Sequence, residues 1–84
     1  MLVNILQKHV NEEKLIKEVR AFETEHNQNA YIFMNKETLE ELVSVCPPLI
    51  YFQAAEYSDG VISSYCGRRV YENESLKFGE VEIR

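Results

Sequence analysis

Apolar and charged residues follow a helical spacing between residues 12 and 26. The apolar members are three or four positions apart, with lysines and glutamates between them. Asn11 stands at the N-cap position, and two glutamates follow where a helix terminus favours negative charge. The pattern predicts a helix over about residues 12–26, ended by the polar segment 27–29. Its buried stripe consists of Leu15, Ile16, Val19 and Phe22.

A second helix is predicted over about residues 36–45. Asn35 stands at its N-cap position, and its apolar residues recur at helical spacing with glutamates on the other side. Pro47 and Pro48 prevent the helix from continuing, because proline lacks the backbone donor and clashes with the preceding turn.

The remaining segments are typical of short strands. Residues 30–34 form an apolar run that predicts a buried strand. Residues 49–66 predict a hairpin around a turn at 58–60, residues 68–72 predict a further strand, and residues 80–84 alternate as a half-buried strand does. Four or five short strands and two helices define an α+β fold, with a mainly antiparallel sheet that carries helices on one side.

The first ten residues fit no single element. Their helix-spaced apolar residues, continued in register, would lead to Glu13 and Lys17 rather than to the stripe of the following helix. Either the chain breaks near Asn11, or the first stripe packs on something else, such as a partner subunit. Helix and strand both remain open for this segment, and residues 1–10 are a candidate self-association or partner-binding segment. The residues concerned are Val3, Leu6 and Val10.

The 84 residues make one domain, 1–84, small enough that disulfides, a metal or a partner subunit commonly add stability. The chain lacks a run of about 20 apolar residues, the length that spans a bilayer. Its start shows neither the basic region nor the cleavage site of a secretory signal. We expect a cytoplasmic protein without membrane contact, with Cys46 and Cys66 reduced and buried as small apolar residues.

The formal net charge is −5, and most of the acidity lies after residue 29. Such a surface repels phosphate backbones and favours basic partners. Arg68 and Arg69 are adjacent in a predicted strand, so they point to opposite faces and do not form one basic patch. We therefore expect no nucleic acid partner.

Recognised catalytic and metal-binding patterns are missing from the sequence. His9 and His26 lie at predicted segment ends and have no nucleophile or carboxylate at a catalytic spacing. The two cysteines and the two histidines are too widely spaced for a local metal motif, and the three glycines are isolated. The prediction is a protein that is not an enzyme and that binds neither metal nor cofactor.

Tyrosines are frequent, five among 84 residues, and tyrosine is enriched at protein interfaces. In the segment 49–57, alternate positions place apolar residues on both faces of the strand. One face of the sheet is therefore a candidate oligomer or partner surface, and the alternative is a sheet covered by one helix on each side. Tyr51 and Tyr57 are the candidate contact residues here.

Two segments together resemble a known pattern. "AYIFMNKETLEEL" (30–42) and "GRRVYENESLKFGEVEI" (67–83) are similar to the peripheral domain of tailed-phage major capsid proteins and to small proteins encoded by phages and prophages of Gram-positive bacteria. Arg69 stands where the capsid pattern often has proline, and the chain is much shorter than a capsid protein. The resemblance implies a phage-type origin and a non-enzymatic role.

Together, these features predict a small phage- or mobile-element-type protein that acts by protein–protein contact. One form is an inhibitor of host defence whose carboxylates take the place of phosphates; the alternative for these acids is an ordinary solvated strand face. A second form is a structural homo-oligomer built on residues 1–10 and the sheet face. A small enzyme with a ligand near Arg68 or Arg69 is the third. The acidic candidates are Glu72, Glu74, Glu80 and Glu82, with Glu56 and Asp59 beside them.

Overall fold

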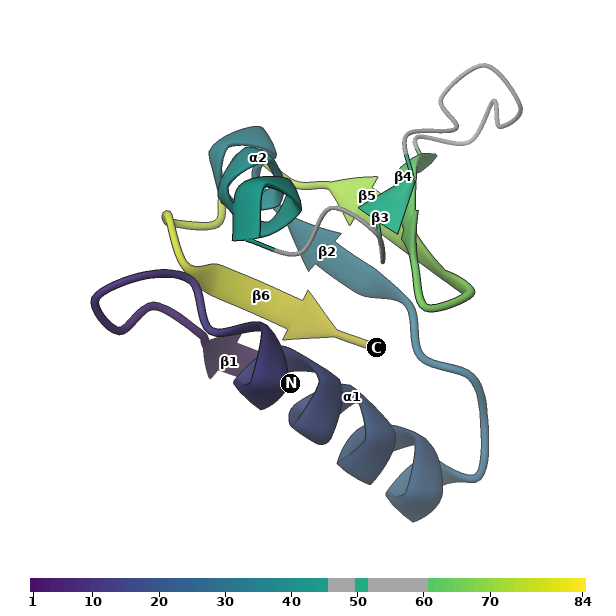
Figure 1. The fold of residues 1–84 in the computed structure, drawn as a ribbon. Coiled ribbons are helices and arrows are strands. Elements are labelled where there is room, and N and C mark those ends of the chain that lie inside the picture. The colour runs from purple at the N-terminus through teal and green to yellow at the C-terminus, as the bar shows by residue number, and fades with distance from the viewer. Residues whose placement is uncertain (46–49, 52–60) are drawn as a thin grey trace.

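The computed structural model describes residues 1–45, 50–51 and 61–84. Two helices and six short strands follow one another along this part of the chain (Figure 1). The α+β class and both predicted helices are confirmed, and the sixth strand comes from the N-terminal segment. The elements are β1 (Leu2–Asn4), α1 (Glu12–His26), β2 (Ile32–Met34), α2 (Lys36–Val45), β3 (Ile50–Tyr51), β4 (Val61–Tyr65), β5 (Arg68–Glu72) and β6 (Glu80–Ile83).

The strands form one sheet in the order β1-β6-β2-β5-β4-β3. The pairs β1–β6, β6–β2, β5–β4 and β4–β3 are antiparallel, and β2–β5 is parallel. The sheet is therefore mainly antiparallel, as predicted. Both helices lie on the same side of it (Figure 1).

Asparagine side chains define where the helices begin. The Asn11 side chain accepts a hydrogen bond from the Lys14 N–H at 3.1 Å, and the Asn35 side chain accepts one from the Thr38 N–H at 2.7 Å. Each bond satisfies a backbone donor that has no partner within the first turn of its helix. At the other end of α1, Asn27 adopts the left-handed conformation with φ of 51°. Asparagine tolerates that conformation, so the helix ends where the polar segment begins.

The core lies between the two helices and one face of the sheet. Its fully buried residues come from all of these elements and form one cluster. Because both helices contribute to the same cluster, the apolar stripes predicted from spacing face a common interior. Its members include Leu15, Val19, Leu39, Leu42, Ile32, Met34, Val70, Val81 and Ile83.

The N-terminal segment is a strand followed by a loop, and the predicted stripe does not form. Val3 and Val10 are buried in the core at 9% and 4% exposure, while Leu6 is 38% exposed. In a strand alternate residues share a face, so Val3 lies with buried Ile5 and not with Leu6. The prediction of Val3, Leu6 and Val10 as a shared contact surface is corrected for this reason.

Several sequence-based predictions lie outside the described residues. The turn at 58–60, Cys46, Glu56, Asp59 and Tyr57 belong to these, and so does the side chain of Tyr51. The antiparallel pairing of β3 with β4 agrees with the predicted hairpin. No helix in the described part of the chain is long and apolar enough to cross a membrane.

Candidate protein-contact surface

One face of the sheet carries no helix among residues 1–45, 50–51 and 61–84. Along the strands, buried side chains that point to the helices alternate with exposed or half-buried side chains that point away from them. We call the second set, together with the strand-flanking residues Tyr31 and Arg84, the open face. Its members are Leu2, Asn4, Tyr31, Phe33, Ser64, Arg69, Tyr71, Glu80, Glu82 and Arg84.

Aromatic rings occupy the middle of the open face. The Phe33 and Tyr71 rings stack with centroids 5.0 Å apart and an interplanar angle of 18°. Tyr31 lies against Tyr71 at 6.2 Å in a tilted arrangement, and 48% of it is exposed. Aromatic pairs prefer such stacked and tilted geometries. These three side chains form what we call the aromatic row.

The Arg84 side chain lies next to the aromatic row, over the ring of Phe33. Its guanidinium carbon lies 4.4 Å from the centroid of the Phe33 ring, a cation–π distance. The chain of β6 flanks β2 on one side and β5 flanks it on the other, so Arg84 and Tyr71 cover opposite faces of the Phe33 ring. Both π faces of Phe33 are therefore occupied within the chain.

Positive and negative side chains lie at different positions of the open face along the strand direction. Tyr31 and Arg84 are joined by two backbone hydrogen bonds of 2.7 and 2.9 Å, and the parallel register brings Arg69 to the same level of the sheet. Glu82 lies level with Phe33, and Glu80 lies one step further in the same direction. The arginines thus mark one end of the aromatic row, and Glu80 lies beyond its other end.

The four glutamates proposed from the sequence do not form one patch. Glu80 and Glu82 share the open face, whereas Glu72 alternates with Tyr71 and belongs to the helix side of β5. Glu74 lies in the following loop, where its carboxylate accepts the Lys36 N–H at the start of α2.

Three of these carboxylates are engaged within the chain. Besides the Glu74 bond, Glu80 accepts the Lys77 N–H at 2.8 Å, and Glu82 pairs with the Arg84 guanidinium at 3.1 Å. Only Glu80 and Glu82 therefore present their charge together on a face of the sheet.

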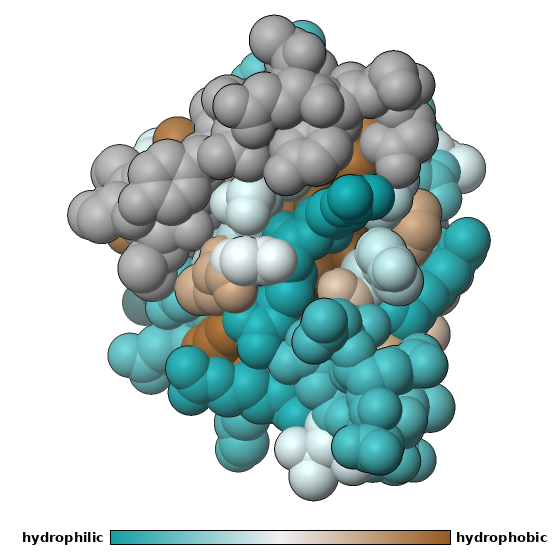
Figure 2. All heavy atoms as spheres, turned by 90° about the vertical axis from the view of Figure 1, so that its right-hand side faces the viewer, coloured by the Kyte–Doolittle hydropathy of each residue, from teal (hydrophilic) through white to brown (hydrophobic). Residues whose placement is uncertain are grey.

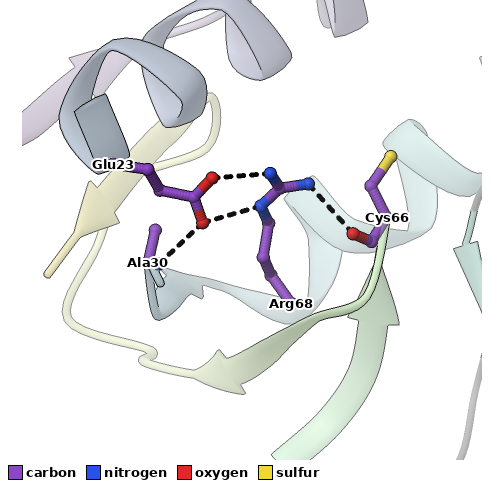
Figure 3. A network of polar contacts seen from close by, with 4 residues as sticks. All are labelled: Glu23, Ala30, Cys66 and Arg68. Atoms are coloured by element: carbon purple, nitrogen blue, oxygen red, sulfur yellow. Dashed lines mark hydrogen bonds and ion pairs between the residues drawn. The ribbon is translucent and has the colours of Figure 1, made fainter. Parts of the chain in front are cut away.

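Arg68 and Arg69 lie on opposite faces, as strand alternation predicts. Arg68 points to the helix side, where its guanidinium donates to both carboxylate oxygens of Glu23 at 2.6 and 2.9 Å (Figure 3). Glu23 also accepts the Ala30 N–H, and Arg68 donates to the Cys66 carbonyl oxygen. The hydrogen bond from Arg68 holds the pKa of the Glu23 carboxyl below its usual value.

This cluster fastens three segments to one another: the end of α1, the entry to β2 and the β4–β5 turn. Arg68 and Glu23 side chains are only 19% and 18% exposed. The Arg68 guanidinium donates both to Glu23 and to the Cys66 carbonyl oxygen, so we call the Arg68–Glu23 pair the structural clamp. The face of the molecule drawn in Figure 2 is mainly hydrophilic, and the visible apolar atoms of its described residues form small separate patches.

Cys66 differs from its prediction. The β4–β5 connection is a two-residue turn in which Cys66 and Gly67 have φ of 49° and 81°, and Cys66 is exposed. Positive φ at both central positions matches the twist of the flanking strands. Cys66 therefore lies exposed in this turn, and the prediction that its thiol is buried is wrong.

The histidines lie apart from each other. The His26 ring stacks on Phe22 at 4.1 Å and is within hydrogen-bond distance of the Phe22 carbonyl oxygen, at 3.0 Å. His9 is exposed and borders an open depression of about 690 Å³ next to the start of α1. The depression is lined by Gln7, Lys8, His9, Val10, Asn11, Glu12, Glu13 and Val45.

No group of three or more metal-ligating side chains occurs among the residues described.

No protein-family model matches this chain, and no curated protein or solved structure is significantly similar to it.

The sequence does not predict the aromatic row. It predicts a buried strand over residues 30–34, but only Ala30, Ile32 and Met34 of these point to the core. Their alternation with Tyr31 and Phe33 was the signal available in the sequence.

Proposed function

We propose that this protein is a non-enzymatic binding protein that acts by protein–protein contact through the open face. The observation that carries the proposal is the aromatic row on a sheet face that no helix of the described residues covers. Tyrosine, phenylalanine and arginine are enriched at protein interfaces, where rigid aromatic side chains supply much of the binding energy. Leu2, 62% exposed, extends this surface along β1.

The surroundings of Phe33 favour a protein over a nucleic acid as the partner. Proteins that bind single strands offer free ring faces to the bases, together with a positively charged groove. Here Arg84 and Tyr71 already cover Phe33, and Glu80 and Glu82 lie on the same face of a chain with net charge −5.

The proposed biological setting is a phage or mobile element, with the partner in the cytoplasm of a bacterial host. The support is the sequence resemblance of residues 30–84. Within it, "AYIFMNKETLEEL" corresponds to β2 and the capped helix α2, and "GRRVY" begins with the β4–β5 turn and runs into β5. Inhibition of a host defence protein is one form of this proposal, in which Glu80 and Glu82 meet a basic surface. Binding of that kind weakens steeply with salt.

Site-specific photo-crosslinking tests the contact surface. A benzophenone amino acid replaces the exposed Tyr31, and the matched control carries it at Lys17, which is exposed on α1. We expect covalent protein adducts from position 31, in producing cells or with the purified protein, and none from position 17. Absence of adducts from position 31, or equal adducts from both positions, would contradict the proposal.

A further inference from the structure

We infer that the open face binds a second copy of this chain, face to face, about a two-fold axis that lies parallel to the sheet and runs across its strands. This inference rests on the proposed function, because it names the partner for the same surface. In this dimer the aromatic rows of the two copies lie against each other.

The charge pattern of the open face is self-complementary in this arrangement. Arg84 lies on one side of the Phe33 level along β6, and Glu80 lies the same distance on the other side, since Glu82 between them is level with Phe33. A two-fold axis across the strands at this level exchanges the two positions. Arg84 of each copy then lies over Glu80 of the other, so the ion pair forms twice.

The other symmetric arrangement is disfavoured by the same charges. An axis parallel to the strands keeps each level of the sheet facing the same level of the second copy. With that axis along β2, Arg84 would face Arg69 of the second copy, and Glu80 would lie at the level of Asn73 without a cationic partner. Like charges in direct contact across an interface are costly, so the pattern selects the axis across the strands.

The residues at the level of Phe33 are also compatible with an axis across the strands. Phe33 meets Phe33 of the second copy on the axis, and Leu2 meets Leu2 at the edge of the sheet. Glu82, which also comes near its own equivalent, keeps its Arg84 partner at 3.1 Å in the same chain. Two sheets pack face to face at about 10 Å with strands nearly aligned, a spacing that side chains of this size fill.

A charge exchange tests the pairing. Arg84→Glu places glutamates at both ends of β6, and Glu80→Arg places arginines at both ends. Each variant repels a copy of itself, whereas a mixture of the two restores both ion pairs. By light scattering after size-exclusion chromatography, we expect wild type at twice the mass of one chain, each variant alone as monomer, and the mixture as dimer.

Lys17→Glu and Glu25→Arg on α1 serve as controls with the same charge changes, and we expect both to remain dimers. Circular dichroism checks that every variant keeps its helices. A wild-type monomer at all concentrations, or a dimer that persists in both single variants, would overturn the inference.

Crosslinking supplies a second readout without any charge change. A benzophenone at position 31 in the purified dimer reaches the level of Asn35 and Glu80 of the second copy if the axis runs across the strands. Adducts mapped to the level of Tyr31 and Arg84 would overturn this axis. Adducts at position 31 only with a different protein would also overturn the inference, while leaving the proposed contact surface in place.

Discussion

Arg84 lies over the ring of Phe33, with its guanidinium carbon 4.4 Å from the ring centroid. The two residues come from neighbouring strands, and the same guanidinium also pairs with Glu82. One side chain thus joins the charged and the aromatic parts of the open face. The arrangement pre-orients the groups that we assign to partner binding, which lowers the entropy lost on association.

Replacing Phe33 by alanine should remove both the partner and part of the stability. The substitution deletes the stack with Tyr71 and the contact with Arg84, so we expect a loss of about 1–2 kcal/mol in unfolding free energy. The dimer should be lost in light scattering, and adducts from position 31 should disappear. Phe78→Ala is the control, because Phe78 is exposed outside the open face. An unchanged mass in Phe33→Ala would contradict the role of the aromatic row.

Asn35 joins two parts of the chain that are distant in sequence. Its Oδ1 accepts the Thr38 N–H at 2.7 Å, and its Nδ2 donates to the Leu76 carbonyl at 3.1 Å. We expect Asn35→Ala to lower the unfolding free energy by about 2–3 kcal/mol, because it removes a helix cap and takes the side-chain donor from the part-buried Leu76 carbonyl. Asn35→Asp keeps the cap and loses only the donor, so it should cost less. Urea denaturation measures both, and equal losses would show that the cap contributes nothing beyond the Leu76 bond.

Local signals made the helices predictable. Asn11 and Asn35 mark helix starts through their own side chains, and the apolar spacing that follows each of them needs no knowledge of the rest of the fold. The strand β1 lacks such a signal. Val3, Leu6 and Val10 fit a helical spacing, and only pairing with β6, some eighty residues away, makes the segment a strand.

The open face was harder to predict for a related reason. Alternation in residues 30–34 and 68–72 separates Tyr31, Phe33 and Tyr71 from the core residues beside them. Which set is covered depends on where both helices pack, and that follows from the whole topology. The parallel pairing of β2 with β5, which brings Phe33 next to Tyr71, joins segments that no short-range pattern relates.

Gly67 and Gly79, the glycines with positive φ in the part of the chain that the structure describes, should respond differently to alanine. Gly79 has φ of +85°, and an added Cβ would lie 2.5 Å from the Leu6 Cβ, whereas Gly67, at φ of +81°, has no atom within 4 Å of that position. Gly67→Ala carries only the backbone cost of about 1–2 kcal/mol. Gly79→Ala adds overpacking, for a total of about 2–4 kcal/mol. Thermal unfolding of the two variants compares them, and equal shifts would mean that the Leu6 loop moves aside freely.

The clamp between Glu23 and Arg68 should make stability depend on pH in the acidic range. Because its hydrogen bond with Arg68 lowers the pKa of Glu23 in the folded state, the folded protein binds this proton less readily than the unfolded chain. The stabilisation is therefore present above the unfolded pKa of about 4.5 and is lost as the pH falls through the lower, folded value. We expect Glu23→Gln to cost about 1–2 kcal/mol at pH 7, as a partly buried charged hydrogen bond does.

At pH 3 the same substitution should cost less, since this pH lies below the unfolded pKa of about 4.5, where the unfolded chain takes up the proton and the stabilisation declines. Glu25→Gln, exposed in the same helix turn, is the control and should have little effect at either pH. Urea denaturation of the three proteins at pH 7, 5 and 3 gives the differences directly. A cost of Glu23→Gln that does not change between pH 7 and pH 3 would show that the geometry of the clamp, and not the charge of Glu23, carries its contribution.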